Sequence, residues 1–152
     1  MSDLVIRRAV AGDTTVLVAF NQALAWETEG QRLDPAVLEA GVTGLLRQPQ
    51  YGFYLVAEAA GTVVAALLIT FEWSDWRNGP LWWLQSVYVQ PAWRRRGVYR
   101  RLYTTVEALA RAEGTVRGLR LYVERENHIA QQTYQALGMR EAPYRLFERL
   151  WP

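Results

Sequence analysis

The stretch that decides the fold reads Val87-Tyr88-Val89-Gln90-Pro91-Ala92-Trp93-Arg94-Arg95-Arg96-Gly97-Val98-Tyr99-Arg100-Arg101-Leu102. An apolar strand ends before the proline, a basic loop with one glycine follows, and a helical periodicity then begins. The N-terminus of a helix offers unpaired N–H groups and a positive dipole end, which together bind phosphate. A glycine in front of it lets the backbone approach a ligand. The pattern predicts a strand, an anion-binding loop and a helix; the alternative is a plain turn with solvated arginines.

The basic residues of the chain are concentrated in this loop. All 17 are arginines, and five of them are Arg94, Arg95, Arg96, Arg100 and Arg101. The other 12 arginines (17 minus 5) stand against 15 acidic residues, which leaves a formal charge of −3 outside the loop. One basic spot on a mildly acidic chain favours a local anion site over a nucleic-acid surface, which spreads basic residues along a face. We therefore expect no nucleic-acid partner.

The composition is typical of one folded domain without metal or thiol chemistry. The chain has 152 residues, of which 51% are hydrophobic and 21% charged. These values suit a single packed domain. Cysteine is absent and His128 is the single histidine, so we expect no disulfide, thiolate nucleophile or metal site. The longest apolar run, residues 63–71, is far shorter than the roughly 20 residues of a membrane span. Since the N-terminus carries no secretory signal, we expect a cytoplasmic protein that does not enter a membrane.

Hydrophobic periodicity, turn residues and helix caps predict the other elements. Upstream of the loop, we expect a strand at 4–10, a helix at 13–26 capped by Asp13, a helix at 34–47 capped by Asp34, and strands at 51–59, 62–73 and 81–89. Downstream, we expect a helix at 98–113, a strand at 118–123, a helix at 127–137 capped by Asn127, and one or two closing strands within 139–150. Residues 27–32 are predicted to form a polar loop.

The predicted order is β-α-α-β-β-β-α-β-α-β(-β), in a single domain over residues 1–152. The fold class is mixed α/β (α+β), a largely antiparallel sheet flanked by about four helices. The connection from strand 81–89 to strand 118–123 runs through a helix, so we expect those two strands to be parallel.

Two motifs resemble those of the GNAT superfamily of N-acetyltransferases. The core Arg94-Arg95-Arg96-Gly97-Val98-Tyr99 resembles motif A, Arg/Gln-x-x-Gly-x-Gly/Ala, except that Tyr99 replaces its second small residue. Residues 127–139, NHIAQQTYQALGM, look like motif B, N-x-x-A-x-x-x-Y-x-x-x-G-F. The order of elements also matches that fold along nearly the whole chain. Residues 71–76 and 81–87 are similar, less specifically, to the diamine (spermidine/spermine) acetyltransferase branch.

The resemblance implies that acetyl-CoA is the acyl donor. Its pantetheine arm would lie along strand 81–89 as an added strand does, and its pyrophosphate would sit on the N–H groups of the basic loop. The residues implied to hold it are Val87, Tyr88, Val89, Arg94, Arg95, Arg96, Gly97, Val98, Tyr99, Arg100, Asn127, Ala130 and Tyr134.

Tyr134 is the catalytic candidate that the resemblance implies. It lies in register with the tyrosine of motif B and would act as a general acid that protonates the departing CoA thiolate. Taken alone, Tyr134 also fits an ordinary boundary tyrosine, with a packed ring and a hydroxyl that reaches water.

The general base is left open by the sequence. Related diamine enzymes have glutamate at the position that matches Gln85, and an amide cannot take up the proton of the amine. Glu27, Glu29 or Glu72, directly or through water, or bulk solvent could do so. For the acceptor we expect a cation-attracting pocket walled by aromatic rings. Its residues would be Trp26, Glu27, Glu72, Trp73 and Gln85. The alternative is that the acids are solvated and the tryptophans belong to the core.

The sequence therefore predicts an N-acetyltransferase that moves an acetyl group from acetyl-CoA to a primary amine of a small molecule by direct attack. The rival prediction is a non-catalytic acyl-CoA-binding or regulatory module, which Gln85 and Tyr99 favour slightly. A homodimer is implied by the resemblance. Its apolar contact surface would lie on the C-terminal strands, at Tyr144, Leu146, Phe147, Leu150 and Trp151.

Overall fold

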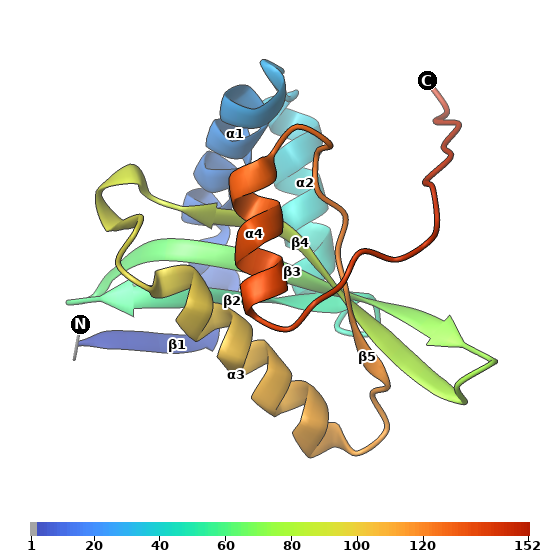
Figure 1. Cartoon of the computed structure of the whole chain (residues 1–152). Coiled ribbons are helices and arrows are strands. Elements are labelled where there is room, and N and C mark those ends of the chain that lie inside the picture. Colours follow the sequence, from blue (N-terminus) through green and yellow to red (C-terminus); the bar gives the residue numbers. More distant parts are fainter. Residues whose placement is uncertain (1–2) are drawn as a thin grey trace. The chain divides into compact units, whose positions relative to one another are not determined.

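The computed structural model describes residues 3–152, and the chain divides into two compact units. The first ends at Leu121 and holds a five-stranded sheet with three α-helices, and the second, Tyr122–Pro152, holds one α-helix (Figure 1). These elements confirm the predicted mixed α/β class. Within residues 3–152, no helix has the length and apolar character needed to cross a bilayer. The grouping of the whole chain into one domain stays a prediction.

The sheet keeps the strands in sequence order. They are β1 (Leu4–Arg8), β2 (Gly52–Ala59), β3 (Thr62–Ser74), β4 (Gly79–Val89) and β5 (Gly118–Arg120). The first four are antiparallel, and β5 runs parallel to β4 as predicted. Because a parallel pair needs a crossover connection, helix α3 links β4 to β5.

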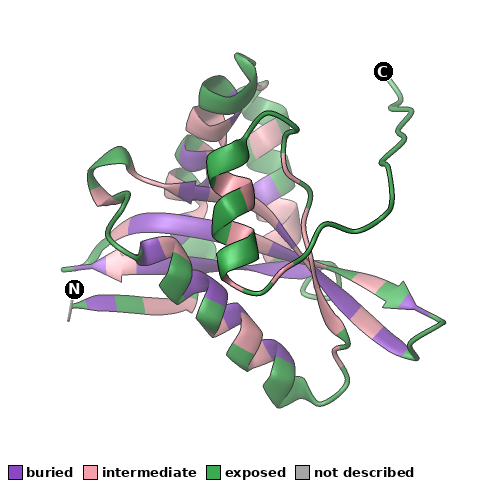
Figure 2. Ribbon diagram, viewed as in Figure 1, coloured by how far each residue is buried: buried purple, intermediate pink, exposed green. Residues whose placement is uncertain are grey.

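The helices of the first unit cover both faces of the sheet (Figure 1). They are α1 (Thr14–Glu29), α2 (Pro35–Leu46) and α3 (Val98–Glu113), with short 3-10 turns η1 (Ala11–Asp13) and η2 (Pro91–Trp93). On the face of α1 and α2, Leu17, Phe20 and Val42 pack with Tyr54 and Val56 of β2. On the other face, α3 buries a single stripe of side chains that recur every four residues along the helix (Figure 2). Alternation along the strands supplies both cores.

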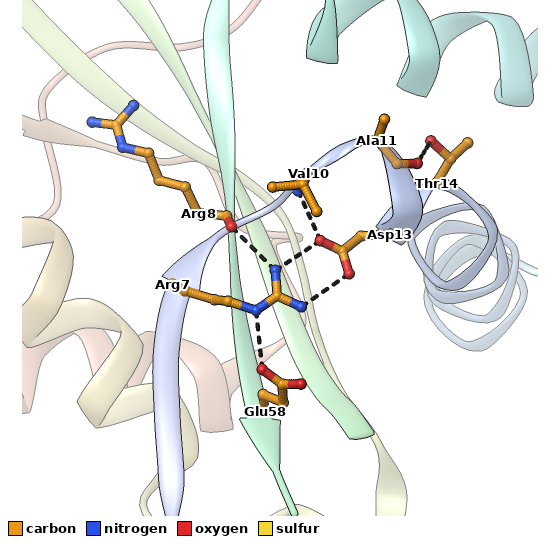
Figure 3. Close-up of polar contacts among 7 residues, drawn as sticks. All are labelled: Arg7, Arg8, Val10, Ala11, Asp13, Thr14 and Glu58. Atoms are coloured by element: carbon orange, nitrogen blue, oxygen red, sulfur yellow. Dashed lines mark hydrogen bonds and ion pairs between the residues drawn. The ribbon is translucent and has the colours of Figure 1, made fainter. Parts of the chain in front are cut away.

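A polar cluster joins β1, β2 and η1 (Figure 3). The guanidinium of Arg7 donates to Glu58 at 3.0 Å and to both carboxylate oxygens of Asp13 at 2.8 and 3.1 Å. Asp13 is 7% exposed and also accepts the N–H of Val10 at 2.8 Å. The hydrogen bond from Arg7 lowers the pKa of Asp13 below its ordinary value. Asp13 precedes α1 as predicted, but its carboxylate makes no capping bond to that helix because Arg7 and Val10 take it.

Four predicted boundaries were wrong. Strand β4 begins at Gly79 rather than at residue 81, because Gly79 and Pro80 still pair with Ser74 and Trp73 of β3. Strand β1 ends at Arg8 rather than at residue 10, since the turn η1 begins at Ala11. Helix α1 continues to Glu29 rather than ending at residue 26, because Gly30 at φ 62° closes it there. Residues 27–29 of the loop predicted at 27–32 are therefore helical. Strand β5 ends at Arg120 rather than at residue 123, since β4 pairs with only three of its residues.

One predicted element was also wrong: residues 139–150 form no strand in the part of the chain that the structure describes. A strand is held by the N–H and C=O groups of a neighbour, and none of the described strands pairs with this segment. Two predicted caps are confirmed: Asp34 accepts the N–H of Ala36 at 3.0 Å, and Asn127 accepts the N–H of Ala130 at 3.2 Å.

Candidate functional site

Strand β4 carries a bulge where its parallel neighbour has ended. Leu68 pairs with Gln85 and Ala66 with Tyr88, so one residue of β3 faces both Ser86 and Val87. Ser86 adopts a left-handed φ of 51°, and two residues against one is the definition of a β-bulge. Since β5 pairs with β4 only at Leu81–Trp83, the edge of β4 beyond that point has no strand neighbour among the described residues. An extended ligand can add to such an edge.

The loop after β4 has a backbone that suits an anion. Arg95 has a φ of 61° and Gly97 a φ of 78°, both left-handed, and α3 begins at the next residue, Val98. Left-handed residues in a turn direct successive N–H groups into one concave surface, and the first turn of a helix adds unpaired N–H groups. A side chain at Gly97 would meet no atom within 4 Å, so the need for glycine here is conformational.

The charge of this loop is exposed, as an anion site requires. Arg95, Arg96 and Arg100 are all exposed, and Arg96 stacks over the Trp93 ring at 4.4 Å. The open β4 edge and this positively charged turn therefore fit the two parts of acetyl-CoA that the resemblance places there, an extended amide arm and a pyrophosphate.

Arg94 differs from its neighbours because its side chain turns toward the end of α1. Its Nε donates to the carbonyl of Val89 at 2.8 Å, and its Nη2 donates to Glu27 at 2.8 Å. The other oxygen of Glu27 accepts the hydroxyl of Tyr88 at 2.8 Å. The bonds from Arg94 and Tyr88 lower the pKa of Glu27, and burial together with Glu27 raises the pKa of Tyr88. Glu27 is therefore ionised at neutral pH and already holds two donors.

A second carboxylate, Glu72 of β3, has a similar environment. It accepts the indole N–H of Trp83 at 2.7 Å, and Nη1 of Arg120 donates to both its oxygens at 3.1 Å. The indole bond, the Arg120 bond and the nearby charge of Arg77 lower the pKa of Glu72. Sequence reasoning did not single out Arg120, although the alternation of residues 118–124 placed it on a polar face and could have indicated it.

The acceptor residues predicted from the sequence are partly brought together. Thr70 pairs with Trp83 and Leu68 with Gln85, so Thr70, Glu72, Trp83 and Gln85 share one face of the sheet. On this face Gln85 donates to the Thr70 hydroxyl at 2.6 Å. Trp73 follows Glu72 directly and so lies on the opposite face. Its predicted role beside Glu72 stays a prediction that the alternation does not support.

Trp26 borders a hollow at the junction of α1 and α2. The guanidinium of Arg32 lies 4.6 Å from the centre of its ring, and the indole is 54% exposed. The hollow has a volume of about 520 Å³ and is lined by Gln22, Ala23, Trp26, Gln31, Arg32, Leu33 and Pro35.

The residues of motif B lie in the second unit, on α4 (His128–Ala136) and in its cap. The carboxamide of Asn127 caps this helix through the N–H of Ala130. Tyr134 is half-buried, and burial raises the pKa of its hydroxyl. Tyr134 therefore stays protonated at neutral pH, which a general acid requires. Within residues 3–152, no three His, Cys, Asp or Glu side chains gather in a way that could hold a metal ion.

The chain matches one family profile and a similar solved structure over most of its length. Residues 17–139 match the profile of the Acetyltransferase (GNAT) family. A protein from Clostridium difficile 630, whose crystal structure is described as that of a possible acetyltransferase, is 41% identical, with a TM-score of 0.92 and 98% of each chain covered. No curated protein matches the sequence.

Two more distant structures share the fold. An aminoglycoside N-acetyltransferase, AAC(6')-Iy, in complex with CoA is 22% identical, with a TM-score of 0.79 over 97% of this chain and 94% of that chain. A predicted acetyltransferase from Clostridium acetobutylicum with acetyl-CoA is 16% identical, with a TM-score of 0.79 over 96% of each chain. At these identities the likeness concerns the fold alone.

Proposed function

Since the chain belongs to the GNAT acetyltransferase family and is an acyl-CoA-dependent N-acetyltransferase, we propose that it acetylates the primary amine of a small molecule by direct attack on acetyl-CoA. The observation that carries this proposal is the bulged edge of β4. It has no strand neighbour beyond Trp83 among the described residues, and it leads directly into a left-handed, arginine-rich turn. An open strand edge followed by such a turn can accommodate the extended arm of acetyl-CoA and then its diphosphate.

The donor site combines the edge of β4 with the turn before α3. Val87, Tyr88 and Val89 lie along the edge that would receive the pantetheine arm, which carries the reactive thioester. The N–H groups of the turn and the first helical turn would receive the pyrophosphate, from Arg95, Arg96, Gly97, Val98, Tyr99 and Arg100. Arg94 pairs with the carboxylate of Glu27 at the end of α1, so the other, exposed arginines of the turn remain available to bind the phosphates. The resemblance also implies a donor-binding role for Asn127 and Ala130, which belong to the second unit.

In the proposed reaction, the amine nitrogen attacks the acetyl carbonyl carbon. A C–N bond forms, the C–S bond breaks, the nitrogen loses one proton and the thiolate gains one. Tyr134 supplies the proton to the sulfur, and its raised pKa keeps that proton available at neutral pH. Positioning of the two substrates supplies the rest of the acceleration.

The proton of the amine leaves through Glu72 or Glu27 by way of water. Both carboxylates have lowered pKa values, so each is ionised but weakly basic at neutral pH. A water molecule between nitrogen and carboxylate would pass the proton onward to solvent. Gln85, oriented by Thr70, would accept a hydrogen bond from the amine without taking its proton. Trp26 and Trp73 complete the proposed acceptor residues.

We also propose that the protein is a homodimer and works in the cytoplasm. The support for a dimer is the segment after α4, where Tyr144, Leu146, Phe147, Leu150 and Trp151 are 64–90% exposed. Apolar side chains at such exposure favour contact with another chain. Size-exclusion chromatography with light scattering would measure a dimer mass for the whole chain, and a lower mass after Phe147→Asp.

The test of the reaction is release of CoA thiol from acetyl-CoA across a panel of primary amines, with calorimetric binding of acetyl-CoA in parallel. We expect amine-dependent release that falls at least about tenfold in Tyr134→Phe while acetyl-CoA still binds. Tight binding without release on any amine would instead support a non-catalytic acyl-CoA-binding module. Absence of binding would overturn the donor site itself.

A further inference from the structure

We infer that the amine acceptor is elongated and carries a carboxylate at its far end, which Arg120 binds. This inference rests on the proposed function, because it names the class of acceptor for the same site. It differs from the cation-attracting pocket expected from the sequence, since it makes the far end of the acceptor site a seat for an anion.

The first argument is the hydrogen bonding of Arg120. Its Nη1 donates to both oxygens of Glu72, and Nε and Nη2 donate to none of the residues that the structure describes. The side chain is only 29% exposed, and a guanidinium in such a position normally uses more of its donors. Two adjacent N–H groups of one guanidinium match the two oxygens of a carboxylate.

The second argument is the local charge. Glu72 is in contact with Arg120 and lies in the field of Arg77, so two positive groups face one carboxylate. The other carboxylate proposed for the site, Glu27, is paired with Arg94 at 2.8 Å. Neither carboxylate is left to attract a second ammonium group, whereas the surplus positive charge beside Glu72 attracts an anion. A polyamine would have to displace an arginine at each carboxylate.

The third argument is the separation between this seat and the bulge. Arg120 pairs with Trp83, and its partner Glu72 pairs with Leu81, whereas the bulge begins at Ser86. Three to five residues of strand, at about 3.3 Å each, correspond to about 10–16 Å. An α-amino acid is too short to span that distance. An ω-amino acid with about eight carbons, or a short peptide that presents a terminal or lysine amine, has the required length.

The experiment compares matched acceptors in the full chain. The series is γ-aminobutyrate, ε-aminocaproate and ω-aminocaprylate, each paired with butylamine, hexylamine or octylamine, which lack the carboxylate; spermidine represents the polyamines. We expect kcat/KM to rise with length in the amino acid series, and ω-aminocaprylate to exceed octylamine by about tenfold or more, as a charged hydrogen bond would give.

The variants separate binding of the carboxylate from an effect on folding. Arg120→Gln should remove the advantage of ω-aminocaprylate over octylamine, so that the ratio of their two kcat/KM values falls to about one, mainly through a higher KM for ω-aminocaprylate. Arg120→Lys should restore part of it. Arg111→Gln, which removes an equally charged but highly exposed side chain on α3, should change neither value.

The outcomes distinguish this inference from the proposed function. If amines are acetylated but octylamine or spermidine is used as well as ω-aminocaprylate, the inference fails and the acetyltransferase stands. An equal loss on both acceptors in Arg120→Gln would also overturn it, because Arg120 would then only support Glu72 and the sheet. If no acceptor releases thiol, the proposed function fails and this inference with it.

Discussion

The guanidinium of Arg94 lies 2.8 Å from the carboxylate of Glu27, so one arginine of the basic loop is bound to the end of α1. The same arginine holds the carbonyl of Val89. It therefore links the last residue of β4, the donor loop and the helix that bears a proposed acceptor residue. Arg94 thus connects the proposed donor site and the proposed acceptor site within the first unit.

Removal of this contact is expected to raise the pKa of Glu27. In Arg94→Gln the largest cause of the lowered pKa disappears, so the carboxyl group should titrate at a higher pH than in the wild type. NMR titration of selectively labelled glutamate measures the shift. Arg95→Gln is the matched control, because no hydrogen bond joins Arg95 to Glu27, and an identical shift in both variants would contradict the assignment.

The Arg7–Asp13 pair is expected to stabilise the fold above acidic pH. Asp13→Asn should lower the free energy of unfolding at pH 7 by about 1–3 kcal/mol, since it leaves Arg7 partly buried with a weaker partner. The pKa of Asp13 is lowered in the folded state, so its contribution is complete above the ordinary pKa of about 3.8 and is lost as the pH falls below that value.

Urea unfolding at pH 7 and pH 3 measures this dependence. The gap between wild type and Asp13→Asn should be widest at pH 7 and narrower at pH 3. Asp75→Asn, at an aspartate with no ion pair among the described residues, should open no gap at either pH. A gap for Asp13→Asn that widens on acidification would refute the pairing as its cause.

Alanine should have opposite effects at two exposed glycines. At Gly97, with φ 78°, we expect a loss of roughly 1 kcal/mol in stability and weaker binding of acetyl-CoA, because alanine is strained in a left-handed conformation. At Gly41, inside α2, alanine should add about 0.5–1 kcal/mol through helix propensity. Thermal unfolding and calorimetry give both quantities. Equal effects at the two sites would show that the turn does not require glycine.

A carboxylate at position 85 should change the preference for acceptors. Gln85→Glu can keep its contact with Thr70, whose hydroxyl would then donate, and adds one negative charge near the bulge. We expect kcat/KM for spermidine to rise relative to that for ω-aminocaprylate, and to fall again at acid pH as the new carboxylate is protonated. Gln85→Met has no charge and should show neither change; parallel behaviour of the two variants would exclude an electrostatic cause.

Local signals in the sequence predicted the elements that carry them. Helix α3 begins and ends where predicted, since Gly97 and Gly114 bound a four-residue apolar repeat. Strand β5 was predicted too long because alternation continues past Arg120, although pairing with β4 does not.

The pairs Arg94–Glu27 and Arg120–Glu72 could not be predicted from spacing. They join residues 67 and 48 positions apart, and they depend on strand register and on the length of α1. The left-handed residue of the bulge is Ser86 rather than a glycine, so no residue type in the sequence indicated a left-handed backbone there.

The most direct test of the central claim is to follow the acetyl group itself. The full chain would be incubated with acetyl-CoA labelled in the acetyl carbons and with ω-aminocaprylate or octylamine, and the products separated by mass spectrometry. We predict a labelled amide on the amine nitrogen, formed in equal amount with free CoA and strongly reduced in Tyr134→Phe. Label that remains in acetyl-CoA, or appears only as acetate, would contradict the account.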